Sequence, residues 1–158
     1  MRCLVVVAAP VLAVLALAAC GSSAPAAATT AAGARRDPNT TQALLRIART
    51  FNENFSANRV GPVYDRWDAR SKAIISRADY VRRHEECPTP PGPATILGAE
   101  PDGEWWLVHY AISDVSLTDY WRYANGRWVF DLIRSNPDAV RLYRLPAAKY
   151  IAAIGCTP

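Results

Sequence analysis

Residues 117–130 read LTDYWRYANGRWVF, in which two segments of alternating apolar and polar side chains flank the dipeptide Asn125-Gly126. Asn-Gly is the preferred pair for a two-residue type I′ turn, because both turn positions need a positive φ. Alternation with a period of two is typical of strands that bury one face. The stretch therefore predicts an antiparallel hairpin in which Leu117–Ala124 pairs with Arg127–Ile133.

Two further strands are predicted directly upstream of this hairpin. Trp105–Ser113 alternates strongly, and Ala94–Glu100 alternates before the turn residues Pro101-Asp102-Gly103. Four consecutive strands joined by short turns form an antiparallel meander. The side chains expected on its inner face are Trp106, Val108, Tyr110, Ile112, Leu117, Trp121, Tyr123, Trp128, Phe130 and Leu132.

Helical signals lie on both sides of the predicted sheet. Apolar residues recur at helical spacing over residues 40–57, Gly61-Pro62 begins a shorter helix, and Ser76 caps a third helix that ends near Glu86. Downstream, Asn136-Pro137-Asp138 starts one short helix and Pro146–Ile154 forms another. The expected fold class is α+β, with N-terminal helices packed on a curved antiparallel four-stranded meander and short C-terminal helices.

The first twenty residues have the character of a secretory signal. Met1-Arg2 is basic, Leu4–Leu17 is apolar and interrupted only by Pro10, and the segment ends in Leu17-Ala18-Ala19-Cys20. Those last four residues resemble the lipobox of bacterial lipoproteins, which implies cleavage after residue 19 and acylation of Cys20. The alternative is a membrane helix that stays in place, but the apolar run is shorter than the roughly 20 residues that a span needs.

The lipobox resemblance divides the chain into three expected parts. Residues 1–19 form a signal peptide, residues 20–38 form the lipidated cysteine and a disordered tether, and residues 39–158 form the folded domain. The protein is then expected on the extracytoplasmic side of the cell membrane, held by the lipid on Cys20. About 120 residues remain for the fold, which suits a single domain.

The charge pattern limits the expected binding partners, and the composition indicates the kind of source organism. The full chain carries 18 Lys and Arg against 14 Asp and Glu, and these charges are interspersed rather than clustered. It has no basic stripe with interleaved aromatics, so nucleic acid is not an expected partner. Lysine occurs only at Lys72 and Lys149, and this arginine bias, together with abundant alanine, suggests an actinobacterial source.

Four cysteines are present, of which Cys3 would leave with the signal peptide and Cys20 would carry lipid. Cys87 and Cys156 remain as an even pair in an oxidising compartment, which predicts one disulfide closing a loop of about 70 residues. A metal site and a reactive thiol are the rival interpretations. Without a CxxC or paired-histidine pattern the two cysteines make a poor metal site, so no metal and no cofactor are expected.

Short strings within the predicted elements carry a resemblance to a known superfamily. They are Tyr64-Asp65-Arg66-Trp67, Ile75–Val81, Asp119-Tyr120-Trp121 and Gly126–Phe130. These strings resemble the NTF2-like (cystatin-like cone) superfamily over residues 40–133. The resemblance implies a cone-shaped domain with an apolar pocket between helices and sheet, and some members of the superfamily use such a pocket as isomerases or cyclases.

The expected pocket is lined by Trp106, Tyr110, Asp119 and Trp121, which share the inner face of the predicted sheet. Asp119, with Tyr110 in reach, has the chemistry of a general base. The alternative is that Asp119 lies at the open rim or pairs with an arginine, and this alternative is the favoured one. No catalytic residue is therefore assigned.

The remaining candidates are an aromatic pair and two histidines without partner motifs. Trp105 and Tyr120 share the outer face of the sheet, where they either form an exposed patch for a homodimer or partner protein or lie beneath the C-terminal helices. His109 is expected on the same outer face. His84 lies late in a helix, where a positive charge suits the helix dipole.

These observations favour a non-enzymatic, lipid-anchored envelope protein whose domain binds a partner protein or a small apolar ligand. The alternative is an NTF2-like pocket enzyme that uses Asp119 and Tyr110. An open cavity lined by these two residues favours a ligand or an enzyme. A cone filled by Trp106, Trp121 and Trp128 favours a protein-interaction module.

Overall fold

The structure is a computed structural model of the 158-residue chain, and it describes residues 36–88 and 90–156. The expected signal peptide, Cys20 and the expected tether up to residue 35 lie outside the described residues. Only Arg36, Asp37 and Pro38 of that tether are described.

Seven helices and four strands make up the described part of the chain. In order they are α1 (Thr41–Ser56), α2 (Val60–Asp65), α3 (Ala69–Lys72), α4 (Arg77–Glu86), β1 (Ala94–Asp102), β2 (Trp105–Ile112), β3 (Val115–Ala124), β4 (Arg127–Phe130), α5 (Leu132–Ser135), α6 (Pro137–Tyr143) and α7 (Ala147–Ala153). The strands form one antiparallel sheet in the order β1-β2-β3-β4. The predicted α+β class with a four-stranded meander is therefore confirmed.

The Asn-Gly hairpin forms as its sequence predicts. Asn125 has φ 52° and Gly126 has φ 76°, which are the positive values that the two central positions of a type I′ turn require. Beyond the turn, Trp121 pairs with Phe130 across β3 and β4. The predicted end of β4 at Ile133 is wrong, because the side chain of Asp131 accepts a hydrogen bond from Arg134 N at 3.0 Å and starts α5.

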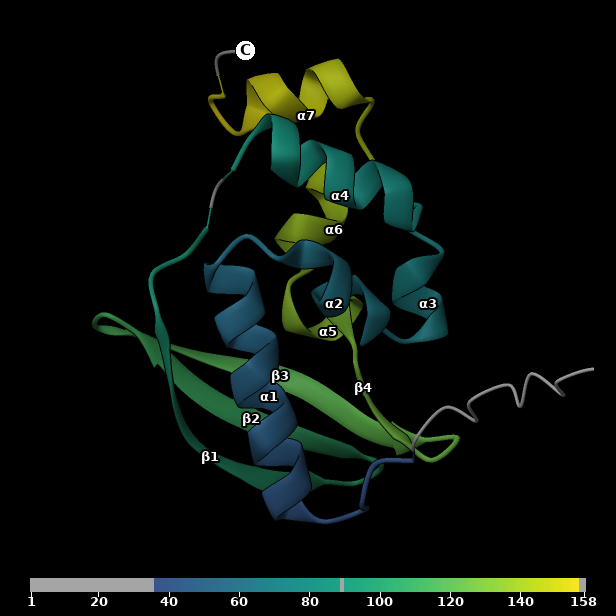
Figure 1. The fold of residues 1–158 in the computed structure, drawn as a ribbon, viewed down its shortest axis with the longest axis vertical. Helices are drawn as coiled ribbons and strands as arrows, with labels where there is room; N and C mark the ends of the chain where they lie inside the picture. Colours follow the sequence, from purple (N-terminus) through teal and green to yellow (C-terminus); the bar gives the residue numbers. More distant parts are fainter. Residues whose placement is uncertain (1–35, 89, 157–158) are drawn as a thin grey trace, which may run out of the picture. The chain divides into compact units, whose positions relative to one another are not determined.

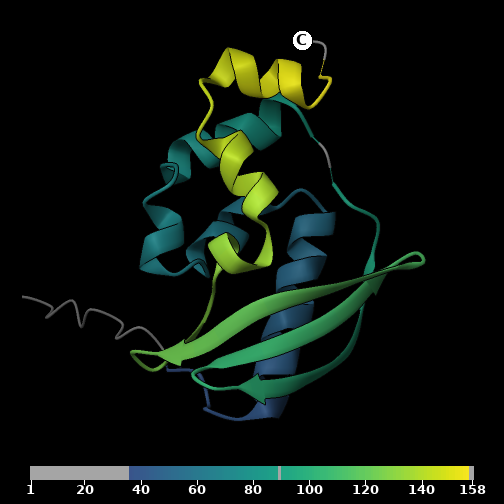
Figure 2. The ribbon, with the colours of Figure 1, turned by 180° about the vertical axis from the view of Figure 1, so that it is seen from behind.

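The helix α1 lies along the concave face of the sheet, and the other helices gather beyond one end of it (Figures 1 and 2). At the contact, Phe51 packs edge-on against Trp121 with ring centroids 5.2 Å apart and lies 4.8 Å from Phe130. Trp121 is 0% exposed and Trp128 is 1% exposed. The centre of the hydrophobic core is thus the interface between α1 and the strands β3 and β4.

Backbone pairing at the outer edge of β4 joins the helices to the sheet. Phe130 N donates to Arg66 O at 2.8 Å, and Asp68 N donates to Phe130 O at 2.9 Å. Asp68 is buried, caps α3 by accepting from Ser71 N at 2.8 Å, and accepts from Arg122 of β3 at 3.2 Å. The four-residue α3 was not predicted, because so short a helix shows no apolar periodicity.

The folded domain begins earlier than its predicted start at residue 39. Asp37 N donates to Gly126 O at 2.8 Å, and the Asp37 carboxylate accepts from Trp128 N at 3.0 Å and from Arg66 at 2.5 Å. Burial opposes ionisation of this carboxyl, but the Arg66 guanidinium and the Trp128 N–H outweigh it and lower the pKa of Asp37. The predicted end of the tether at residue 38 is therefore too late, because Asp37 is hydrogen-bonded to the hairpin.

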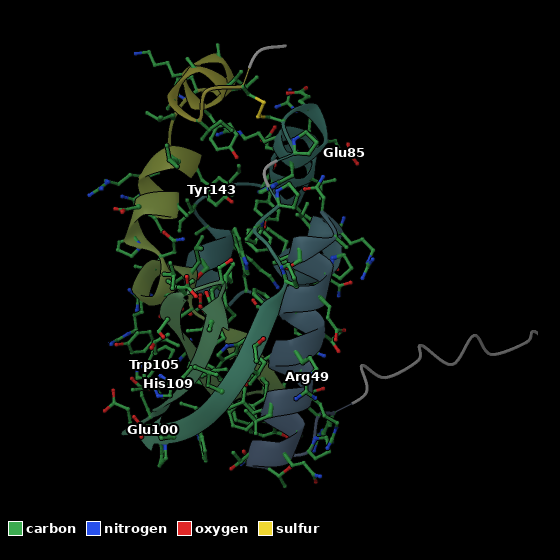
Figure 3. All side chains as sticks on the ribbon, turned by 90° about the vertical axis from the view of Figure 1, so that its left-hand side faces the viewer. Arg49, Glu85, Glu100, Trp105, His109 and Tyr143 are labelled. Carbon is green, nitrogen blue, oxygen red and sulfur yellow. A yellow bond between two sulfur atoms is a disulfide. The ribbon has the colours of Figure 1, made fainter. Side chains whose placement is uncertain are left out.

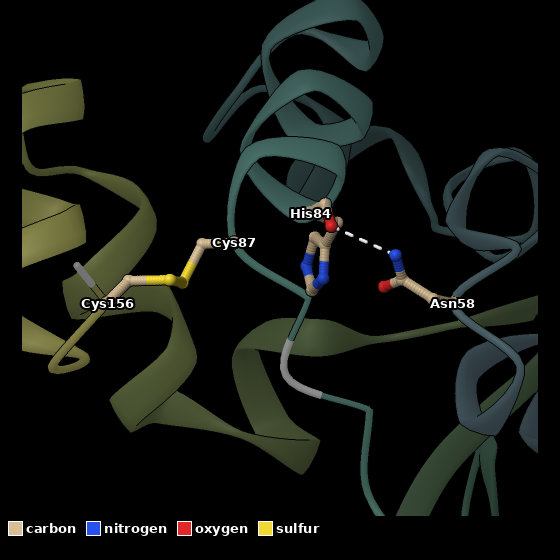
Figure 4. Close-up of a disulfide and its surroundings, with 4 residues drawn as sticks. All are labelled: Asn58, His84, Cys87 and Cys156. Carbon is tan, nitrogen blue, oxygen red and sulfur yellow. Dashed lines mark hydrogen bonds between the residues drawn. A yellow bond between two sulfur atoms is a disulfide. The ribbon is translucent and has the colours of Figure 1, made fainter. Parts of the chain in front are cut away.

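A disulfide joins Cys87, directly after α4, to Cys156, which follows α7 (Figure 4). This is the pairing that the cysteine count predicts, with the two Cα atoms 6.0 Å apart and 69 residues apart in sequence. Nearby, Asn58 Nδ2 donates to the backbone oxygen of His84 at 2.9 Å. In the chain-entropy description, a loop of this length gives about 4 kcal/mol of stabilisation. The covalent link therefore holds the C-terminal helix on α4.

The burial of Trp121 yields a stability prediction. Trp121→Ala should lower the free energy of unfolding by about 3–5 kcal/mol, because it removes a large aromatic side chain from the centre of the core. Leu97→Ala is the matched control, since Leu97 lies in the same sheet but is 60% exposed, and its effect should stay within about 0.5 kcal/mol. Guanidinium denaturation of both variants measures the difference, and equal effects would contradict this description of the core.

Candidate functional site

A cavity of about 170 Å³ lies between α1, the strands β2 and β3, and the helices α5 and α6. Much of its wall is aromatic, from Phe51, Phe55, Trp67, Tyr80, Phe130 and Tyr143. Its polar side chains include Asn52, Tyr110, Asp119, Ser135 and Asn136. The site is thus mostly apolar with a few convergent polar groups, which is the usual composition of a small-molecule pocket.

Two of the four predicted pocket residues line this cavity and two do not. Tyr110 and Asp119 contribute to its wall, as expected. Trp121 instead packs against Phe51 in the closed core, and Trp106 lies edge-on to Trp128 with centroids 6.0 Å apart. All four predicted residues share one face of the sheet, but Phe51 of α1 packs on that face at Trp121. The prediction that Trp106 and Trp121 line the pocket is therefore wrong.

Asp119 is buried, with 5% of its surface exposed, and it lies opposite Val108 in the register of β2 and β3. Its Oδ1 accepts a hydrogen bond from the Tyr110 hydroxyl at 3.4 Å. None of the ion pairs formed within residues 36–88 and 90–156 includes Asp119. Both favoured alternatives for this residue, an open rim and an arginine partner, are therefore wrong.

Burial without a charged partner changes the acidity of the site. Desolvation raises the pKa of Asp119 to about 7, although the hydrogen bond from Tyr110 opposes this shift. Burial also raises the pKa of Tyr110, and the neighbouring carboxylate raises it further. Tyr110 therefore stays protonated and donates to Asp119, while Asp119 exchanges between its neutral and ionised forms near neutral pH.

Most other polar groups of the wall are already used within the fold. Asn52 Nδ2 donates to Ala48 O at 3.1 Å, Ser135 Oγ accepts from Tyr120 N at 2.8 Å, and the Asn136 side chain accepts from Ala139 N at 2.9 Å. These three bonds fix the wall around the cavity rather than leave it free to adapt.

Sequence reasoning missed the contributions of Asn52 and Trp67 to the site. Trp67 is only 2% exposed, and its indole N–H has no hydrogen-bond partner among the described residues. Asn52 lies one helical turn after the buried Ala48, on the stripe of α1 that packs against the sheet. A polar side chain on an otherwise apolar stripe was the available signal for Asn52. No feature of the sequence pattern indicates that the Trp67 indole N–H would lack a hydrogen-bond partner among the described residues.

Neither histidine belongs to the cavity. His84 is buried, with Nε2 3.0 Å from the Tyr143 hydroxyl, and burial lowers its pKa to about 4. At neutral pH His84 is therefore uncharged and does not supply the positive charge that would suit the end of its helix. His109 lies on the outer face of the sheet, as expected, with Nδ1 3.0 Å from Thr118 Oγ1 and Nε2 3.4 Å from Glu100 (Figure 3).

The expected exposed patch around Trp105 is absent. Trp105 lies on the face of the sheet away from α1 but is only 6% exposed (Figure 3). The guanidinium groups of Arg122 and Arg134 lie 5.2 Å and 4.8 Å from its ring centre. Arg122 comes from β3 and Arg134 from α5, so Trp105 is covered by arginine side chains of these two elements. Trp105, the largest side chain of the patch suggested for a homodimer, is thus not exposed.

The described residues place limits on metal and membrane roles. Within residues 36–88 and 90–156, no group of three His, Cys, Asp or Glu side chains is placed to hold a metal ion. Over the same residues, no helix has both the length and the apolar character that a membrane span requires.

Comparison with known proteins adds little to this geometry. No protein-family model and no curated protein matches the chain. A solved structure of a SEC-C motif-containing protein from Rhodopseudomonas palustris is similar over 54% of this chain and 72% of that chain, with 14% identity and a TM-score of 0.34. A likeness at this level assigns no family and no function.

The pKa of Asp119 yields a stability prediction with a definite sign. The folded-state pKa of about 7 lies above the unfolded value near 3.8, so between these values the folded state binds more protons than the unfolded state. Stability from this group is therefore complete at low pH and is lost as pH rises toward 7 and beyond, by about 4 kcal/mol in total. Asp119→Asn should remove this component and become the more stable protein at about pH 8.

Urea denaturation across this pH range measures the difference between the Asn variant and the unchanged protein. Asp114→Asn is the matched control, because Asp114 lies in the exposed turn between β2 and β3 and its loss should leave the pH profile parallel to that of the unchanged protein. If the stability of Asp119→Asn also changes with pH in parallel with that of the unchanged protein, Asp119 is not a buried carboxyl group without a charged partner.

Proposed function

We propose that this protein is a lipid-anchored, extracytoplasmic protein with an NTF2-like domain that binds a small, mostly apolar molecule. The observation that carries the proposal is the cavity of about 170 Å³, whose aromatic wall also presents Asp119 and Tyr110. The same concave face is closed by Trp121 and Trp128, which are fully buried. The cone is thus filled at one end and open at the other.

The energetics of the cavity favour a ligand over a packing defect. Protein interiors are close-packed, and a void lined by large side chains costs stability because the contacts it removes are not replaced. Burying Asp119 without a charged partner adds a second cost. Perturbed carboxyl groups within clefts occur preferentially at functional sites, where binding or chemistry compensates for them. Two unfavourable features at one place therefore support a bound molecule there.

The lipid anchor is supported by the sequence and by the disulfide. Leu17-Ala18-Ala19-Cys20 resembles a lipobox, and Cys20 is the residue that would be acylated. The disulfide between Cys87 and Cys156 is the bond expected of a chain that folds in an oxidising compartment. Two or more acyl chains are sufficient for stable anchoring, whereas one chain binds membranes only marginally.

The NTF2-like assignment is supported by the arrangement of the layers. A long helix, α1, lies in the concave face of a bent antiparallel meander (Figure 2). Residues of that helix and of the sheet line the cavity. The strings that carried the resemblance supply both layers, since Trp67 precedes α3 and lines the cavity while Asp119 belongs to β3.

An enzyme is the second candidate, and one observation favours it. Asp119 has a pKa of about 7 and faces a cavity, which suits a general base at neutral pH. Tyr110, hydrogen-bonded to the same carboxyl group, would orient it. The partner-protein alternative has lost support, because Trp105 is buried beneath two arginines.

The anchor is tested by Cys20→Ala. The substitution removes the acylated thiol, so the protein should move from the membrane fraction to the medium or accumulate as an unprocessed precursor. Cell fractionation with immunoblotting measures the distribution, and Cys3→Ala is the control that should leave it unchanged. Normal processing and membrane retention of Cys20→Ala would show that the protein is not a lipoprotein.

The ligand site is tested by Ala139→Leu. Ala139 lines the cavity, so three additional carbon atoms should fill it and exclude the ligand. The matched control is Ala152→Leu, because Ala152 lies on α7 and is exposed. Each protein is purified from native membranes, and its small molecules are released by denaturation and identified by mass spectrometry.

A small molecule recovered from the unchanged protein and from Ala152→Leu, but not from Ala139→Leu, supports the proposal. Equal recovery from all three proteins, or recovery from none, would refute it. Incubation of the recovered molecule with purified protein separates the two candidate functions, because a binding protein returns it unchanged and an enzyme converts it to a product.

A further inference from the structure

We propose that the cavity takes a small organic cation, an amine whose ammonium group pairs with the Asp119 carboxylate and whose apolar body lies among the aromatic rings. This inference rests on the proposed ligand-binding function and adds the charge and chemical class of the ligand. Three features of the cavity carry it: an unpaired buried acid, a wall of aromatic rings, and a volume that fits one ring with a short arm.

The first feature is the absence of a positive charge to balance Asp119. The titratable groups that face the cavity are Tyr110 from β2, Tyr80 from α4 and Tyr143 from α6, and burial raises the pKa of each phenol. The described residues of α1, α2 and α5 place no charged side chain in the wall. Asp119 is therefore the one group of the described wall that carries a charge near neutral pH.

The two basic side chains at the end of α4 that pack near Tyr143 are committed elsewhere. Arg83 of α4 donates to the backbone oxygens of Tyr143 and Leu145 and stacks over the ring of Tyr150. His84 bonds to the Tyr143 hydroxyl and is neutral near pH 7, because burial lowers its pKa to about 4. Within residues 36–88 and 90–156 these groups therefore offer no counter-ion to Asp119, and a cationic ligand would supply one.

The second feature is the aromatic wall. Seven aromatic rings line the cavity: those of Phe51, Phe55, Trp67, Tyr80, Tyr110, Phe130 and Tyr143. The faces of such rings attract cations, and aromatic cages with a nearby acid are a recurring way to hold an ammonium group. An apolar ligand without charge would use the rings but not the acid.

The third feature is size. An apolar cavity of about 150 Å³ holds benzene, so the cavity of about 170 Å³ fits one six-membered ring with a short substituent. Benzylamine, which has one ring and one aminomethyl group, is a probe of this size. Benzyl alcohol has nearly the same shape without the charge.

The chemistry of Asp119 separates the classes of ligand by their pH dependence. An anion would meet the buried carboxylate without a counter-ion and is excluded. A neutral molecule binds best when Asp119 is protonated, so its affinity should stay level or fall as pH rises. A cation binds the ionised form, so its affinity should rise through the pKa of Asp119 near 7 and should release a proton.

The experiment is isothermal titration calorimetry of the purified full chain, with benzylamine and benzyl alcohol as the probes. Benzylamine should bind at least about tenfold more tightly at about pH 8 than at about pH 5.5, as ionisation of Asp119 requires. Benzyl alcohol should bind no more tightly at about pH 8 than at about pH 5.5. Titrations in two buffers with different ionisation enthalpies should show that benzylamine binding releases protons near pH 7.

Three variants locate the effect. Asp119→Asn keeps the size of the side chain and should abolish both the preference for the amine and its pH dependence. Asp114→Asn removes an exposed carboxylate from the neighbouring turn and should change neither. Ala139→Leu should eliminate binding of both probes, because it fills the cavity. Thermal unfolding of each variant confirms that it is folded.

The outcomes separate this inference from the function on which it rests. Equal affinity for both probes, or an amine preference that persists in Asp119→Asn, overturns the cation proposal and leaves ligand binding intact. Binding of neither probe also overturns it. The ligand-binding function fails as well only if the native membrane preparation yields no small molecule that Ala139→Leu excludes.

Discussion

The register of β3 against its two neighbours is the constraint on which the candidate site depends. Side chains alternate along a strand, so Asp119 and Trp121 must lie on the same face of the sheet. A shift of one residue would turn both to the opposite face. Burial of the Trp121 side chain contributes about 4–6 kcal/mol, and burial of Phe130, which lies opposite it, adds about 1.5–3 kcal/mol. These contributions exceed the cost of burying Asp119, which is about 4 kcal/mol when it is ionised.

The cavity exists because β4 ends early. If β4 continued in the same register, Leu132 would pair with Asp119 across the sheet. Instead Asp131 caps α5, and the exposed backbone of Tyr120 is satisfied by Asp131 N and by the Ser135 hydroxyl. The chain then continues as α5 and α6, which line the cavity together with Asp119. The early end of β4 thus leaves part of the concave face open.

Local signals in the sequence were sufficient for the sheet and for most helices. The Asn125-Gly126 turn, the alternation of β2 and β3, and the Ser76 cap each act within a few residues, and each appears in the structure. Alternation also put Asp119 on the inner face. What alternation does not determine is which element covers that face. The exclusion of Trp121 from the cavity depends on α1, which contributes Phe51 from seventy residues upstream.

The same limit explains the remaining differences at the outer face and in the helical layer. Trp105 is covered by Arg122 and by Arg134 of α5, a contact that no local pattern encodes. His84 is buried because Tyr143, almost sixty residues later, folds against it. Long-range packing of this kind decides whether a titratable group is solvated, and therefore decides its pKa. The sequence pattern singled out both residues, but it left the cover of Trp105 open and did not indicate the burial of His84.

The most direct test of this account is the ionisation of Asp119 itself. Carbon-13 NMR of the side-chain carboxyl groups, with Asp119 assigned through Asp119→Asn, follows its titration in the folded protein. The account predicts a midpoint near pH 7, as expected for a buried acid without a charged partner. A midpoint close to 3.8, the ordinary value for aspartate, would show that Asp119 is solvated or paired with a cation and would contradict the account.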